Sequence, residues 1–247
     1  MWTQRRCIQR RIRRSQVGAA ITEFLIVGPV AIFFTFLIIQ SGMLYMAKLT
    51  LNNATFMAAR DGATKNVSYN NDNPIRLSLA KGLIPFYQNS LNTDDSKRLG
   101  DALIKATVDV QATGHVPGMG AHIEVLSPSA DAFKAYGITD GKTTYIPNDN
   151  LEFRTATPMN GANLSIQDAN ILRIKVTYAY PLKVPLMAAI IKRIMCPLAG
   201  SSAVTAWNNP GLTPIGDDVD DCAFYMQGNV PIVSYATVQM QSNPQLN

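Results

Sequence analysis

Residues that serve in catalysis and metal binding are scarce in this chain. Its 247 residues include only two histidines and three cysteines. The histidines, His115 and His122, lie in a segment rich in Gly and Pro with no cysteine nearby to complete a zinc site, so we expect surface or packing roles for them. A G-x-S-x-G nucleophile motif and a phosphate-binding glycine loop are also missing from the sequence. These absences argue against an enzyme, and we predict no cofactor.

Acidic residues are missing from the first 22 positions, whereas six arginines lie there: Arg5, Arg6, Arg10, Arg11, Arg13 and Arg14. After Glu23, about 24 uncharged and mostly apolar residues run from Phe24 to Ala47. A helix rises about 1.5 Å per residue, so this run spans roughly 36 Å and can cross a bilayer core of about 30 Å. The arginines predict a cytoplasmic N-terminus and a C-terminal bulk outside the membrane. We therefore expect a single-pass inner-membrane protein with its C-terminal domain in the periplasm.

Glu23 is the exception in this pattern, because it is a carboxylate at the entrance of an apolar run. Burying an unpaired carboxylate in a bilayer is costly, so such a residue either lies at the headgroup level or has a partner. Its surroundings have a known counterpart. Gly18 followed by AAITEF, residues 19–24, resembles the processing site of type IV prepilins. A proline six residues after the glutamate, Pro29, and the continuation LNNATFMAARDGA at residues 51–63 resemble the TadE-like minor pilins of tight-adherence systems.

The resemblance covers residues 14–64 and returns weakly at residues 171–186 and 230–241, while residues 65–165 match no family that we can name. It implies cleavage after Gly18 by a prepilin peptidase, which leaves Ala19 as the new N-terminus and Glu23 as the fifth residue, followed by Phe24. Glu23 would then pair with the free ammonium of a neighbouring subunit. The implied partners are other pilin and minor pilin subunits, the inner-membrane assembly platform and membrane lipid.

The resemblance implies a minor pilin or pseudopilin that joins or initiates a type IV pilus for surface attachment, and that ends on the cell surface. It divides the chain into a leader (1–18), a transmembrane and extended helix (19–64) and an extracytoplasmic domain (65–247). Two alternatives stay open. One is a pseudopilin of a protein-secretion machine, and the other is an uncleaved, signal-anchored binding domain in which Glu23 is incidental.

Removing the six leader arginines would change the formal charge from +5 to −1, so no nucleic-acid partner is expected. Cys7 would leave with the leader. Cys196 and Cys222 would remain in an oxidising compartment, where we expect a disulfide, with two buried free thiols as the alternative. An acidic loop nearby is a weak candidate for Ca²⁺, and a solvated loop is the preferred interpretation: Asp217, Asp218, Asp220 and Asp221.

The coarse pattern predicts an α+β fold, with one long N-terminal helix followed by an antiparallel sheet and short packing helices. Helical spacing continues past the membrane to Ala59, and Asp61-Gly62 indicates the helix end. Gly28 and Pro29 predict a kink, because proline removes a backbone hydrogen bond. The remaining expected elements are helices at 77–91 (interrupted by Pro85), 94–105 and 182–195, and strands at 106–112, 122–126, 143–146, 171–180, 203–207 and 230–240.

Overall fold

The computed structural model describes residues 17–67, 73–88, 94–111, 119–159, 164–184, 187–195 and 224–246. The chain divides into two compact units, residues 1–39 and 40–247. One helix, α1 (Val17–Ala63), runs through the boundary between them and is 47 residues long. The predicted long helix is therefore confirmed, and it ends four residues later than the last position of the predicted helical pattern.

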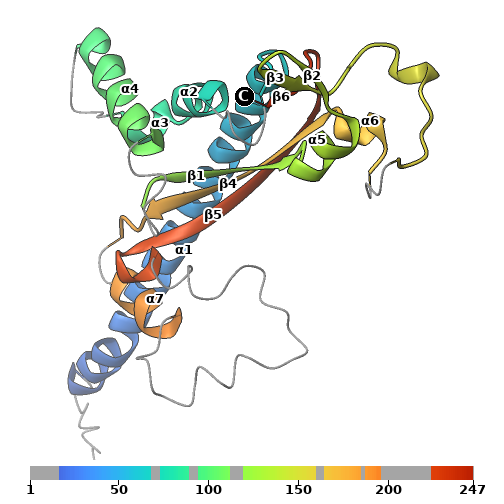
Figure 1. Ribbon diagram of the computed structural model, residues 1–247. Helices are drawn as coiled ribbons and strands as arrows, with labels where there is room; N and C mark the ends of the chain where they lie inside the picture. The colour runs from blue at the N-terminus through green and yellow to red at the C-terminus, as the bar shows by residue number, and fades with distance from the viewer. Residues whose placement is uncertain are drawn as a thin grey trace, which may run out of the picture. The chain divides into compact units, whose positions relative to one another are not determined.

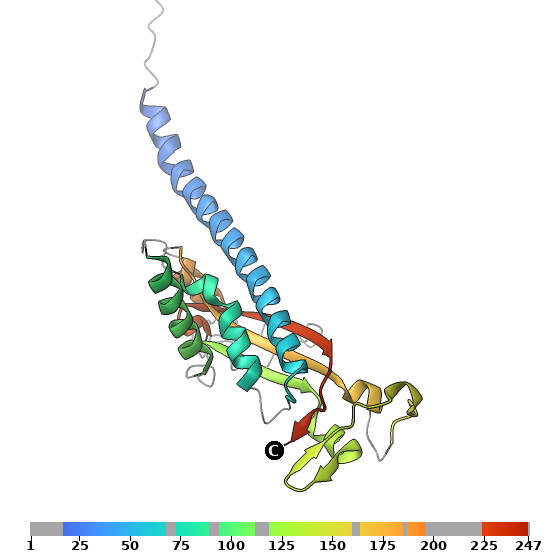
Figure 2. The ribbon, with the colours of Figure 1, turned by 90° about the horizontal axis from the view of Figure 1, so that it is seen from above.

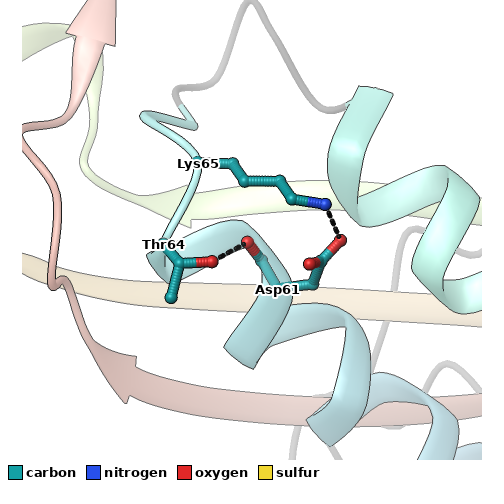
Figure 3. A network of polar contacts seen from close by, with 3 residues as sticks. All are labelled: Asp61, Thr64 and Lys65. Atoms are coloured by element: carbon teal, nitrogen blue, oxygen red, sulfur yellow. Dashed lines mark hydrogen bonds and ion pairs between the residues drawn. The ribbon is translucent and has the colours of Figure 1, made fainter.

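The end of α1 is closed by local contacts that Figure 3 shows. The backbone N–H of Thr64 and its Oγ1 both donate to the carbonyl of Asp61, at 3.3 Å and 2.9 Å. The Lys65 ammonium lies 2.8 Å from the Asp61 carboxylate, which offsets a negative charge at the end of the helix where the helix dipole is itself negative. The carbonyl of Ala63 accepts from the N–H groups of Gln241 and Ser242. The last turn is thereby bonded to the C-terminal part of the chain.

The main sheet has three antiparallel strands in the order β1–β4–β5, as Figure 1 shows. These are β1 (Ala121–Ser127), β4 (Ile171–Pro181) and β5 (Asn229–Gln239). They confirm the strands predicted at 122–126, 171–180 and 230–240. Alternate residues of β4 are buried, and they share one core with the outer part of α1. The fold is α+β, as expected.

Three helices that follow α1 in the chain and precede β1 complete this core: α2 (Asn73–Gly82), α3 (Ile84–Tyr87) and α4 (Asp95–Gln111). Pro85 lies in the first turn of α3 and separates it from α2, as the sequence predicted. A Cβ added to Gly82 would lie 2.6 Å from Cβ of Ala54, so α2 approaches α1 closely at this point.

The strand predicted at 106–112 is wrong, since residues 106–111 form the last turns of α4. Ala102, Ala106 and Val110 are buried at a spacing of four, which is the period of a helix face. The alternation that suggested a strand covers only a few residues. The burial of one helical face against the core therefore outweighs this short alternation.

Residues 127–169, which the sequence indicated as rich in turns, contain several short elements around a second small core. They are α5 (Ala130–Tyr136), β2 (Ile138–Asp140), β3 (Thr143–Tyr145), the 3₁₀ turn η1 (Leu151–Phe153) and α6 (Ile166–Ala169). The C-terminal strand β6 (Gln245–Leu246) pairs with β3 in a second sheet of order β2–β3–β6. The weak strand predicted at 143–146 is thus present. The helix predicted at 182–195 is α7 (Met187–Met195), and the strand predicted at 203–207 lies outside the described residues.

Candidate membrane anchor and assembly helix

The N-terminal part of α1 exposes an almost continuous apolar surface. Among the helices that the structure describes, the segment Glu23–Ala63 of α1 is long and apolar enough to cross a membrane, judged by length and composition. Large side chains within it are exposed, for example Phe24 at 77% and Ile26 at 70%. Exposed apolar surface of this extent indicates an environment of lipid or of other helices. One N-terminal apolar helix is compatible with a single-pass anchor.

The residues of the predicted processing site lie at the start of this helix. Gly18 and Ala19 are in the first turn of α1, and Glu23 follows in the next turns with an exposed side chain. Glu23 is the only charged residue between Val17 and Lys48. Cleavage at Gly18 and the pairing of Glu23 are not tested by these features and remain predictions.

Gly28 and Pro29 lie inside α1, which is continuous in secondary structure through both residues. A Cβ added to Gly28 would lie 3.6 Å from the ring of Phe24, an ordinary van der Waals distance. Gly28 is therefore not required there to avoid a steric clash. The predicted kink stays a prediction.

The outer part of α1 is bonded along its length to β5 and to the residues that follow this strand. The Lys48 ammonium donates to the carbonyl of Val233, the Ser234 hydroxyl donates to the Asn52 side chain at 2.9 Å, and the α1 terminus binds residues 241 and 242. The residue numbers of the two partners increase together from one contact to the next, so α1 and β5 run in the same direction. Helix α1 and the sheet are thus joined by polar contacts as well as by the shared core.

Gln40 lies on α1 before these residues, inside the uncharged run of residues 24–47, and it also binds the part of the chain that follows α1. Its side chain is 3% exposed, and its Oε1 accepts from the backbone N–H of Val184 at 3.1 Å. Gln40, Lys48 and Asn52 were not among the site residues predicted from the sequence. A signal was available, because these polar residues are spaced at multiples of four on an apolar helix and so share one face.

A second polar feature lies where α3, α4 and β4 meet. The Tyr87 hydroxyl donates to the Asp109 carboxylate, and its oxygen lies 3.0 Å from that of Tyr178. Phe86 stacks on Tyr178 with ring centroids 5.2 Å apart. Burial raises the pKa of Tyr87 well above its usual range, and the neighbouring Tyr178 and Asp109 raise this pKa further. Burial likewise raises the pKa of Tyr178 to about 12, although the hydrogen bond with Tyr87 acts in the opposite direction.

Several predicted site residues lie outside the described residues: positions 1–16 of the leader, His115, Cys196, Cys222 and the four aspartates of the acidic loop. Within the part of the chain that the structure describes, no group of three or more His, Cys, Asp or Glu side chains could hold a metal ion. His122 lies on β1 with an exposed side chain. Among the described residues, the two candidate features are therefore the apolar helix α1 and the polar cluster of Tyr87, Asp109 and Tyr178.

Comparison with known proteins gives one match. A family model described as TadE-like protein matches residues 18–60, which begin at Gly18 and cover most of α1. Neither the curated proteins nor the solved structures returned a match. Residues 18–60 of this chain, which form most of α1, are therefore similar to the TadE-like family.

Proposed function

We propose that this protein is a minor pilin or pseudopilin, cleaved after Gly18 and incorporated into, or initiating, a type IV tight-adherence pilus for surface attachment. The observation that carries the proposal is the family match, which starts at Gly18 and follows α1 to Arg60. The exposed apolar surface of α1 supports it. Before assembly this surface would lie in the inner membrane, and after assembly it would contact the helices of other pilin subunits.

Glu23 has a specific role in this proposal. Cleavage creates an ammonium at Ala19, and an opposite charge on a neighbouring subunit can neutralise it where the dielectric is low. Two unpaired charges in that environment would each be penalised. The pair would therefore set the depth at which one helix enters the bundle.

The head domain, the part of the chain that follows α1, supplies the contacts to neighbouring subunits or to a surface. Its polar contacts with α1, from Gln40 to Ala63, support this division of roles. A head bonded to its own helix moves with that helix when the subunit enters a fibre. We propose no catalysis and no cofactor for this domain.

The N-terminus of the protein purified from native membranes tests the proposal, by intact mass and peptide sequencing. We expect a chain that begins at Ala19, and accumulation of the full-length form in a Gly18→Ala variant. Gly28→Ala is the matched control, because its added Cβ makes only ordinary contacts and leaves the processing site unchanged. A chain that still begins at Met1 in cells with an active prepilin peptidase would contradict the proposal and favour a signal-anchored binding domain.

A further inference from the structure

The helix α7 lies at one end of the main sheet, where β4 finishes and β5 begins (Figure 1). The segment between β4 and α7 is attached to α1, because the N–H of Val184 donates to Gln40. The turn before β5 approaches α7 from the other side, since a Cβ on Gly228 would lie 3.8 Å from Cβ of Ala188. These contacts place α7 beside the Gln40 level of α1.

Gln40 lies close to the point where α1 would leave the bilayer. From Glu23, a hydrocarbon core of about 30 Å accommodates roughly 20 helical residues and ends near residue 43. Gln40 is thus within about one helical turn of the outer boundary. The polar contacts of Lys48 and Asn52 with β5 begin beyond that boundary. A helix at the level of Gln40 therefore lies near the boundary between the acyl chains and the headgroups, from which Lys and Arg side chains can extend to the headgroups.

The side chains of α7 divide into an inner and an outer face. Met187 is buried, and Ile190 and Ile191 are half-buried, so the apolar face of the helix is largely covered by the protein. Lys192 and Arg193 are exposed in the last turn, and α7 contains no acidic residue. Lys183, just before the helix, is exposed as well. None of these three cations makes an ion pair with any of the residues that the structure describes.

We propose that Lys183, Lys192 and Arg193 form a basic collar that binds the phosphates of anionic lipids at the outer surface of the inner membrane. This inference rests on the proposed membrane insertion of α1. The collar contacts headgroups and not acyl chains, because the apolar face of α7 is already packed against the protein. Its cations match anionic phosphates in charge, and each cation near such a surface favours binding by about fivefold. The collar would hold the head in one orientation before the subunit leaves the membrane.

The test uses the full chain in two kinds of nanodisc, one of phosphatidylcholine alone and one that also contains phosphatidylglycerol. Hydrogen exchange is followed in peptides that cover residues 187–195. We expect slower exchange in the anionic nanodisc, and loss of this difference at high salt, because salt screens exposed charges. A benzophenone amino acid at the exposed position Ala189 gives a second readout, and we expect its lipid adducts to be enriched in the anionic nanodisc.

The Lys192→Gln/Arg193→Gln variant should weaken the docking of α7 by roughly 30-fold and abolish both differences. The matched control is Lys105→Gln/Lys142→Gln, which removes the same charge from α4 and from the β2–β3 turn and should preserve them. Equal exchange and equal cross-linking in the two nanodiscs would overturn the collar, while slow exchange of residues 24–39 would show that the anchor is still inserted. Free exchange of residues 24–39 in both nanodiscs would instead overturn the anchor itself and the collar with it.

Discussion

At the scale of single residues, small side chains decide how closely α2 and α1 approach. Ala54 on α1 faces Gly82, where an added Cβ would lie 2.6 Å from Cβ of Ala54 and 2.7 Å from its Cα. One of these two contacts is with backbone, which a rotamer change cannot relieve. Gly82 is therefore a packing requirement of the core, although it lies at a helix end where its sequence context indicates only a stop.

The Gly82→Ala variant should lower the free energy of unfolding of the head by about 1–3 kcal/mol, because the two helices must separate. Gly100→Ala is the matched control, since Gly100 lies inside α4 and no atom comes within 4 Å of the added Cβ. This control should stabilise the protein by about 0.5–1 kcal/mol through helix propensity. Denaturant unfolding of the full chain in detergent measures both, and equal effects of the two changes would contradict the close approach.

The proposed assembly assigns Glu23 one specific role, the pairing with the ammonium of a neighbouring subunit. A Glu23→Gln variant should still be cleaved after Gly18, but its incorporation into sheared pili should fall at least tenfold, because the ammonium of a neighbouring subunit loses its partner. Glu152→Gln removes the same charge from an exposed site on η1 and should assemble normally. The measurement is the ratio of subunit in the pilus fraction to subunit in membranes. Normal incorporation of the Glu23 variant would contradict the pairing.

At the scale of elements, the contact of α3 and α4 with β4 depends on protonated tyrosines. The folded pKa of Tyr178 is about 12 against an ordinary value of 10.0, so the folded state favours the protonated hydroxyl. A group whose pKa is raised on folding contributes its stability in full below the unfolded pKa, and loses that contribution as pH rises through the folded pKa. The window for Tyr178 is therefore about pH 10 to 12.

We expect the free energy of unfolding to fall across that window by up to about 3 kcal/mol for Tyr178 alone. The double variant Tyr87→Phe/Tyr178→Phe should flatten this alkaline dependence. Tyr235→Phe is the control, because Tyr235 is 54% exposed on β5 and should leave the dependence unchanged. Burial also raises the pKa of Tyr180, so a smaller alkaline dependence should remain in the double variant. Denaturant melts at a series of pH values give the comparison, and a dependence as steep in the double variant as in the wild-type protein would disprove the assignment.

At the scale of the whole molecule, α1 is bonded to the middle of β5 and to the two residues 241 and 242 that follow it closely, and the two elements share one core. Figure 2 shows the sheet and α1 lying along one another in this part of the chain. From Ala47 to Ala63, α1 is itself part of the core that the sheet and the helices α2 to α4 share.

The remaining prediction at this scale concerns the cysteines. The sequence predicts that Cys196 and Cys222 form a disulfide in the exported protein, closing a loop of about 26 residues. In the chain-entropy model such a loop contributes about 3–4 kcal/mol. The mature protein should show no reactive thiol when denatured without reductant, and a Cys196→Ser/Cys222→Ser variant should be destabilised, whereas Cys7→Ser should not. Two reactive thiols in the denatured wild-type protein would rule out the disulfide.

The amino-acid sequence by itself determined the features that depend on local periodicity. A long uncharged run after an arginine-rich segment specifies one helix, because backbone groups in lipid must be bonded within the segment. Alternation over 171–180 specifies β4 for a local reason as well. Successive side chains of a strand point to opposite faces, so a two-residue period places the apolar residues on the face that is buried.

Only the tertiary structure decided the rest. Residues 106–111 became helix because a four-residue spacing of small side chains could be buried against the core, which the local alternation did not reveal. Likewise Gln40 and Val184, and Tyr87 and Asp109, are far apart in the sequence, and no local pattern pairs them. The partner of a polar side chain depends on which segments the core brings together, so the contacts that bind α1 to the head required the folded chain.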